Sequence, residues 1–138
     1  MQGGARLLLL GLVAFVGAVV PACHSDTNSA LGVTERFIDA HYVRIDLNAA
    51  VPLCTGLALQ KLNEEQRLTQ GQQIDESTRK PTIRYRLLDK KEEDGDHATF
   101  VFEGTIHVED AGQFTRKWLI SARRSDASWK VSNFEEFD

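Results

Sequence analysis

Residues 82 to 138 alternate between apolar and polar side chains, and short turn sequences interrupt the alternation at regular intervals. The turns are Asp94-Gly95, Asp110-Ala111-Gly112 and Ser125-Asp126. Alternation with a period of two is typical of strands that bury one face, and short turns with Asp or Gly join antiparallel neighbours. This half of the chain therefore predicts a meander of four antiparallel strands.

The turn positions also predict the strand register. In all three hairpins the large apolar residues fall on one face, which a slip of one residue would undo. The predicted pairs are Ile83 with Ile106, Tyr85 with Gly104 and Leu87 with Phe102; Arg116 with Ile106, Trp118 with Gly104, Ile120 with Phe102 and Ala122 with Phe100; and Trp129 with Ala122 and Val131 with Ile120.

The part of the chain before the strands has helical periodicity. Ala30, Val33, Phe37 and Ala40 recur at helical spacing, which predicts an amphipathic helix from about residue 30 to Arg44. Asp46 can cap a short second helix that Pro52 ends, and Thr55 can cap a third that carries Leu57, Ala58 and Leu62. Residues 69–80 are polar and predict an exposed connection or a frayed helix end.

The N-terminus has the layout of a secretory signal. Arg6 precedes an apolar run from Leu7 to Val20, and the run closes in Val20-Pro21-Ala22-Cys23. A helix needs roughly 20 apolar residues to span a bilayer, so this run is short for a permanent membrane helix. We predict cleavage after residue 22, a polar tether over residues 23–30 and one domain over residues 31–138.

The end of this signal resembles the lipobox of bacterial lipoproteins. The resemblance implies a diacylglycerol on Cys23, often with a further acyl chain such as palmitate, and hence a durable membrane anchor. It also implies a lipid-anchored protein of the cell envelope, in the outer membrane facing the periplasm if the cell has two membranes. Pro21 departs from the usual pattern; the alternative is a secreted or periplasmic soluble protein with a free thiol at Cys23.

Charge and cysteine content narrow the function classes. Loss of residues 1–22 removes Arg6 and no acid, which leaves 15 basic and 20 acidic side chains, a formal charge of −5. That balance argues against a general nucleic-acid binder. With Cys23 acylated, Cys54 has no disulfide partner; with Cys23 free, a bridge between the two is the alternative.

Helices followed by a four-stranded meander, together with three short sequences, resemble a known superfamily. The sequences are Phe37-Ile38-Asp39-Ala40, Leu53-Cys54-Thr55-Gly56-Leu57-Ala58 and the terminal Trp129-Lys130-Val131. They are similar to the nuclear-transport-factor-two-like proteins, particularly small bacterial lipoproteins of unknown function. The resemblance covers residues 31–138 and implies an α+β fold, with helices packed on a curved antiparallel sheet in a cystatin-like cone. Such domains commonly bind small molecules or dimerise through the sheet.

Several side chains on the predicted inner face could line a pocket. The ligand-binding candidates are Tyr85, Arg116, Trp118 and Asn133 on the strands and His41 on the first helix. Arg116 could anchor a carboxylate, although an ion pair with Glu135, Glu136 or Asp138 is the simpler interpretation. His41 also suits a core or rim position, and Cys54 suits packing. The four histidines lack metal-ligand spacing, so we expect no metal and no cofactor.

The same face lacks the carboxylate that isomerase chemistry requires. A ketosteroid-isomerase-like reaction needs a carboxylate base within an apolar cavity and a hydroxyl donor. Tyr85 could donate, but the only acid predicted on the inner face is Asp89, close to a turn. We therefore predict a noncatalytic domain that binds a small apolar or carboxylate ligand or a protein partner. The alternative is a ketosteroid-isomerase-like or dehydratase-like enzyme.

The outer sheet face is basic although the domain is acidic. Its candidate partner surface is Arg84, Arg86, Leu88, Val101, Lys117 and Leu119. Cross-strand pairing of Arg86 with Glu103, and of Leu88 with Val101, would account for part of this pattern. The apolar residues in a basic setting also predict a contact with a second copy of the chain or an envelope protein.

Overall fold

The computed structural model describes residues 28–72 and 79–138. The predicted signal peptide, Cys23 and most of the tether lie outside the described residues. Within the described residues, no helix is both long and apolar enough to cross a membrane.

The three helices begin at the positions that the sequence predicts. Helix α1 (Ala30–Ile38) starts after Ser29, whose hydroxyl accepts a hydrogen bond from the Gly32 amide at 2.9 Å, and it continues as a π-helical turn, η1 (Asp39–Val43). Asp46 caps α2 (Leu47–Ala50) through the amide of Ala49 at 3.0 Å, and a 3-10 turn, η2 (Val51–Leu53), follows. Helix α3 spans Gly56–Leu68 and has Thr55 at its N-cap position, as predicted, but the Thr55 side chain makes no capping hydrogen bond.

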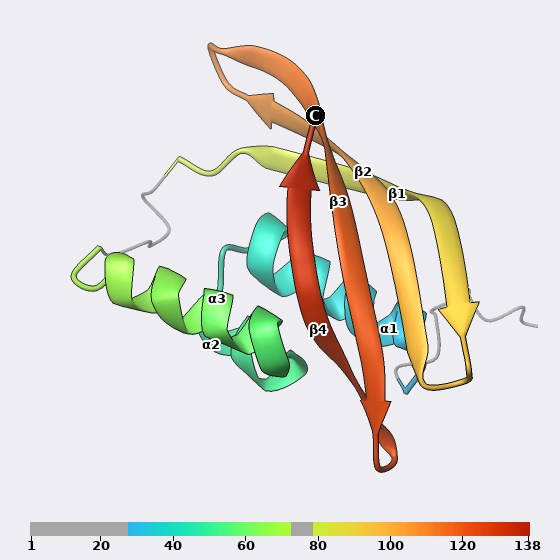
Figure 1. The fold of residues 1–138 in the computed structure, drawn as a ribbon. Helices are drawn as coiled ribbons and strands as arrows, with labels where there is room; N and C mark the ends of the chain where they lie inside the picture. Colours follow the sequence, from blue (N-terminus) through green and yellow to red (C-terminus); the bar gives the residue numbers. More distant parts are fainter. Residues whose placement is uncertain (1–27, 73–78) are drawn as a thin grey trace, which may run out of the picture.

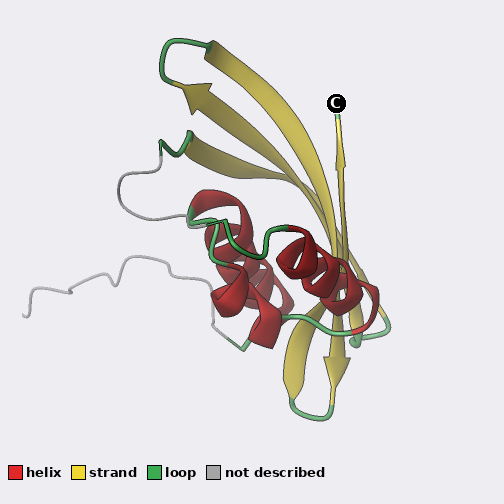
Figure 2. Ribbon diagram, turned by 90° about the vertical axis from the view of Figure 1, so that its left-hand side faces the viewer, coloured by secondary structure: helices red, strands yellow, loops and turns green. Residues whose placement is uncertain are grey.

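The second half of the chain is the predicted antiparallel meander (Figure 1). Its strands, β1 (Thr82–Glu93), β2 (His97–Val108), β3 (Gly112–Ser125) and β4 (Ser128–Phe137), pair in the order β1-β2-β3-β4. The sheet curves around the helical segments, which lie on its concave face (Figure 2). The α+β fold predicted from the sequence is confirmed.

The first hairpin keeps its predicted register from Thr82 to Leu87, because a longer turn and a bulge offset each other. Its turn has three residues between Glu93 and His97, where the sequence predicts two. A bulge at Leu88 takes up the extra residue, so Tyr85 still pairs with Gly104.

Between that bulge and the turn the predicted pairing is wrong. Asp89, rather than Leu88, pairs with Val101. Asp89 therefore lies on the outer face, and the acid predicted for the inner face is not there. The physical reason is that one extra residue in a strand reverses the side of every residue beyond it.

The second hairpin is displaced by two residues from the prediction. Trp118 pairs with Phe102, and Arg116 pairs with Gly104 rather than with Ile106. The turn closes between Val108 and Gly112, one pair earlier than predicted. Because the displacement is even, every side chain keeps its predicted face.

The third hairpin is displaced by two residues and then bulges at Ser132. Val131 pairs with Ala122 rather than with Ile120. Beyond the bulge, Phe134 pairs with Ile120 and Asn133 pairs with Ser121. Asn133 is therefore not on the inner face, and the prediction that placed it there is wrong.

The core lies between the concave face and α1. Its largest fully buried side chains include Phe37 from α1, Phe100 and Phe102 from β2, and Trp118 and Ile120 from β3. Trp129 is only partly buried at its edge. Burial of this inner face holds the register and fixes which side chains reach the open end of the sheet.

Candidate functional site

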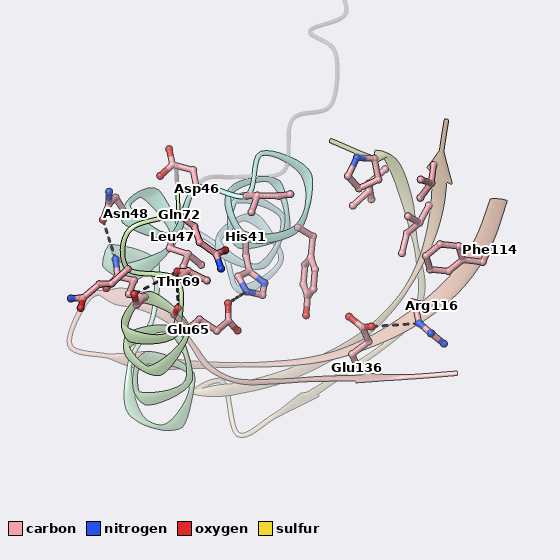
Figure 3. Close-up of a pocket in the computed structure, with 18 residues that line it drawn as sticks. His41, Asp46, Leu47, Asn48, Glu65, Thr69, Gln72, Phe114, Arg116 and Glu136 are labelled. Atoms are coloured by element: carbon pink, nitrogen blue, oxygen red, sulfur yellow. Dashed lines mark hydrogen bonds and ion pairs between the residues drawn. The ribbon is translucent and has the colours of Figure 1, made fainter. Parts of the chain in front are cut away.

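An open groove of about 980 Å³ separates the helical segments from one end of the sheet. In Figure 3, Phe114 and Arg116 on β3 lie on one side, and Asp46, Asn48 and Thr69 lie on the other. At this end of the sheet the strands extend beyond the helices (Figure 2), and the groove lies between them and the helical segments.

The two sides of the groove differ in chemistry. The strand side is largely apolar, with Ile83, Ile106, Val108 and Phe114 among its lining residues, and its two charged lining residues are Arg116 and Glu136. The helical side carries amides, hydroxyls and carboxylates; its polar lining residues are His41, Asp46, Asn48, Glu65, Gln66, Thr69, Gln70 and Gln72. An apolar wall opposite a few polar groups is typical of small-molecule sites.

His41 lines the groove, and both of its ring nitrogens are unavailable to a ligand. Its Nε2 lies 2.7 Å from a carboxylate oxygen of Glu65 on α3. Its Nδ1 is buried without a hydrogen-bond partner, and the ring stacks on Phe37 with centroids 5.1 Å apart. This is the core or rim position that the sequence suggests, with a carboxylate partner that no sequence spacing indicates.

Tyr42 is a partly buried polar group in the same wall. Its ring stacks on Trp118 with centroids 4.2 Å apart. Burial raises the pKa of its phenol well above the usual value, and the nearby charges of Glu136 and Glu65 raise it further. Tyr42 therefore stays protonated, and its hydroxyl can act as a donor.

Glu136 reaches the groove because of the bulge at Ser132. It pairs across the sheet with Trp118, and one of its oxygens lies 3.5 Å from Nε of Arg116. Arg116 also forms an ion pair with Asp138. The guanidinium is thus held by Glu136 and Asp138, which is the ion pairing that the sequence offers as the simpler interpretation of Arg116.

Every charged side chain that lines the groove has a partner within the chain. Glu65 binds His41, Asp46 caps α2, and Glu136 binds Arg116. A carboxylate ligand would have to displace Glu136 or Asp138 from Arg116. The groove therefore suits an uncharged molecule better than the carboxylate predicted from Arg116 alone.

Ile45 lines the groove in a strained backbone conformation. Its φ is +54°, in the left-handed region that β-branched residues rarely adopt. The conformation ends the helical segment, since the amide of Asp46 donates to the carbonyl of Ala40 at 2.8 Å. Glycine is the usual residue at such a position, so an isoleucine there keeps an apolar side chain at the groove.

Three of the predicted ligand-binding candidates lie outside this lining. Tyr85 donates its hydroxyl to Asp39 at 2.9 Å, and Trp118 is fully buried. The side-chain oxygen of Asn133 accepts from Nζ of Lys61 at 2.9 Å. Of the five candidates, Arg116 and His41 line the groove.

A smaller opening of about 500 Å³ lies between α3 and β4. It shares His41, Tyr42, Glu65 and Glu136 with the groove. Its cation, Lys61, also donates to the carbonyl oxygen of Phe134 at 2.6 Å. These four shared residues form the partition between the two openings.

The described residues contain no group of three or more His, Cys, Asp or Glu side chains that could hold a metal ion. Cys54 is a buried free thiol next to β4, and burial raises its pKa to about 12. Such a thiol is a poor nucleophile at neutral pH.

The partner-surface candidates lie on the sheet face opposite the helices. The guanidinium of Arg86 binds Glu103 at 2.9 Å, as cross-strand pairing predicts. Leu88 is 41% exposed at the bulge, while Val101, Lys117 and Leu119 are half-buried. Arg84 is exposed on the same face.

No protein-family model and no curated protein sequence matches the chain. Solved structures do match. A ketosteroid isomerase-like protein from Erwinia carotovora atroseptica is 14% identical with a TM-score of 0.58, over 78% of this chain and 91% of that chain. A putative calcium/calmodulin-dependent protein kinase type II association domain from Thiobacillus denitrificans is 11% identical with a TM-score of 0.59, over 77% and 91%.

The VirB8 protein of Agrobacterium tumefaciens is also similar, at 7% identity and a TM-score of 0.54, over 84% of this chain and 96% of that chain. At these identities the likeness shows the fold alone. Domains with this fold differ in function, so the function has to be argued from the groove.

Proposed function

We propose that this chain is a lipid-anchored domain of the cell envelope that binds a small, uncharged, largely apolar molecule in the groove without transforming it. The observation that carries the proposal is the contrast between the two walls. The strand wall offers apolar surface, and the charged groups on both walls already have partners within the chain, as in the pairs of Glu65 with His41 and of Glu136 with Arg116. Such a site gains free energy from apolar burial and orients the ligand through neutral donors and acceptors.

The state of His41 supports binding over catalysis. A general base must reach the proton that it removes. The Nε2 atom of His41 is occupied by Glu65, and its Nδ1 is buried under neighbouring side chains. The imidazole therefore positions Glu65 and the helix rather than facing a substrate.

Two phenylalanines provide a matched test. Phe114 lines the groove and is 45% exposed, whereas Phe137 is 43% exposed and lies outside the lining. Each ring also has a cation beside it, Arg116 at 5.6 Å and Lys117 at 6.0 Å. Truncation of either residue to alanine thus removes the same ring from similar surroundings. The chief difference is that only Phe114 lines the groove.

The probe is the neutral fluorophore N-phenyl-1-naphthylamine, with native mass spectrometry of the detergent-extracted protein to detect a copurified ligand. We expect Phe114→Ala to weaken probe binding at least about fivefold, as for loss of an aromatic contact. Phe137→Ala should leave binding unchanged. Equal effects of the two substitutions, or a copurified protein in place of a small molecule, would contradict the proposal.

The anchor is the second part of the proposal. The short apolar run that ends at Cys23 supports it, since a cysteine at a cleavage point is rare by chance. Intact-mass analysis of the protein from its native membrane should give residues 23–138 plus a diacylglycerol, with or without a further acyl chain. An unmodified Cys23, or retention of residues 1–22, would contradict it.

A ketosteroid-isomerase-like or dehydratase-like enzyme is the second candidate, and one observation favours it. The bulge at Ser132 brings Glu136 into the cone, where the protonated Tyr42 also lies. The test is turnover of a β,γ-unsaturated ketosteroid. Turnover that is lost in both Glu136→Gln and Tyr42→Phe would replace the binding proposal with catalysis, whereas a rate equal to that of buffer supports binding.

A further inference from the structure

A separate cavity of about 440 Å³ lies on the sheet face that carries no described helix. Its lining residues all have side chains with polar groups: Thr82, Arg84, Thr105, His107 and Gln113. The residues come from three neighbouring strands, and none of them lines the groove. Nothing in the proposed function of the groove uses this cavity.

The strand register explains why these side chains converge. Thr82 pairs with His107, Arg84 pairs with Thr105, and His107 pairs with Gln113 on the next strand. Residues paired across a sheet share a face, and so do residues two apart along a strand. The five side chains therefore form two adjacent rows that run across the strands on one face, one of Thr82, His107 and Gln113 and one of Arg84 and Thr105. Neighbouring strands within a row lie about 4.8 Å apart.

The lining side chains of this cavity supply hydrogen-bond donors and no acidic group. All five side chains can donate hydrogen bonds, through a guanidinium, an imidazole, two hydroxyls and a carboxamide. No carboxylate is among them. A cavity with several donors, a fixed positive charge and no acidic group is complementary to an oxyanion.

Arg84 differs from its neighbour Arg86 in one respect. Arg86 binds Glu103 through Nε at 3.1 Å and through its terminal nitrogen at 2.9 Å. Among the residues that the structure describes, no carboxylate forms an ion pair with Arg84. The guanidinium of Arg84 is therefore free to bind a ligand.

We propose that this outer cavity binds a phosphate group, with Arg84 as its charged anchor. An arginine fork and neutral donors from two sides match the several oxygens of a tetrahedral phosphate better than a planar carboxylate. The phosphate can come from a free phosphorylated molecule, which is a monoester, or from a phospholipid headgroup, which is a diester. Both share the oxyanion that the cavity recognises.

The experiment is an NMR titration of the mature protein in a neutral detergent with inorganic phosphate, at constant ionic strength held with chloride. We expect saturable shifts of the amides of Arg84, Thr105 and His107 and of the His107 ring. Arg84→Gln should weaken the affinity about tenfold or more, because a charge-assisted bidentate contact is lost. Thr105→Val, which removes one neutral donor, should weaken it less.

Arg86→Gln is the matched control, since it removes the same charge from the same strand and face but outside the cavity. It should change the affinity by less than twofold. A response to phosphate no larger than the response to chloride would overturn the proposal. Equal losses in Arg84→Gln and Arg86→Gln would also overturn it, because they would mean general attraction to a basic face.

Competition then identifies the source of the phosphate. Displacement of inorganic phosphate by glycerophosphoglycerol, a diester, supports a lipid headgroup. Displacement by phenyl phosphate alone supports a free monoester. Failure of both organic phosphates to compete would overturn the proposal, because the site would then admit no phosphate group that carries a substituent.

Discussion

The indole of Trp118 occupies the space in which a side chain at Gly104 would lie. A Cβ atom built on Gly104 would fall 2.6 Å from Cζ2 of Trp118, and still closer to Cη2. The indole cannot move away easily, because it is fully buried and stacks on Tyr42 with centroids 4.2 Å apart. Gly104 thus sets the depth at which Trp118 and Tyr42 pack below the groove.

We expect Gly104→Ala to lower the free energy of unfolding by about 1–3 kcal/mol, the usual cost of overpacking a core. Urea unfolding measures it. In a Trp118→Phe background the smaller ring leaves room, so the same substitution should cost less than half as much. The same cost in both backgrounds would mean that the clash is with the backbone instead.

At position 45 we expect a glycine variant to be more stable than an alanine variant, although alanine is usually the more stabilising of the two in a folded chain. Because its φ is +54°, glycine fits the backbone and alanine is strained. We expect Ile45→Gly to be more stable than Ile45→Ala by about 1 kcal/mol in urea unfolding. An alanine variant that is equally or more stable would show that the chain leaves the left-handed conformation.

Because His41 and Glu65 are in contact, we expect substitutions at the two positions to have coupled effects on stability. Glu65→Ala leaves a buried ring nitrogen without a partner and should cost about 1–3 kcal/mol of unfolding free energy. In a His41→Phe background that cost should largely disappear, since the nitrogen is gone. A double-mutant cycle measures the coupling, and additive effects would argue against the contact.

Cys54 predicts a loss of stability at high pH. Its pKa in the folded protein is raised to about 12, from 9.0 in the absence of burial. Between these values the folded thiol holds a proton that the unfolded thiol has lost, so stability falls as pH rises, by up to about 1.4 kcal/mol per pH unit. The contribution is fully present below pH 9.

The check is urea unfolding between pH 8 and 11, with Cys54→Ala as the control. The alanine variant should be less stable at pH 8 but should lose less stability as the pH rises. Parallel pH profiles for the two proteins would contradict the raised pKa.

Arg116→Gln tests whether the guanidinium binds the ligand or only stabilises the fold. Its ion pairs with Glu136 and Asp138 are partly exposed, so the substitution should lower the free energy of unfolding by no more than about 1 kcal/mol. Binding of the neutral probe should change by less than twofold, because the arginine is already engaged. A large loss of probe binding without a change in thermal midpoint would restore Arg116 as the ligand anchor.

Much of the fold follows from local signals. The start of the first helix at residue 30, the cap at Asp46 and the four alternating strands are all where the sequence predicts them. The displacements of two residues in the second hairpin, and in the third hairpin up to the bulge at Ser132, leave each side chain on its predicted face, because a strand has a period of two. The inner face of Trp118 and Ile120 was therefore predictable without correct partners.

The groove was predictable only in part. Arg116 and His41 line it as expected, but Glu65 and Tyr42 were missed, and Glu136 was named only as one possible partner of Arg116. Glu65 lies 24 residues from His41 on another helix, and no sequence spacing signals that contact. Glu136 depends on the bulge at Ser132, for which the alternation of β4 gives no clear sign.

The sequence by itself determined the types and order of the elements, the inner and outer faces of most strand residues, and the acidic balance of the chain. Local propensity and periodicity suffice for these, because each depends on neighbours along the chain. The tertiary structure decided where the bulges fall, which charges neutralise one another in the groove, and that Arg86, unlike Arg84, has a carboxylate partner among the described residues. Those outcomes depend on packing between distant segments, and a single inserted residue reverses the face of every residue beyond it.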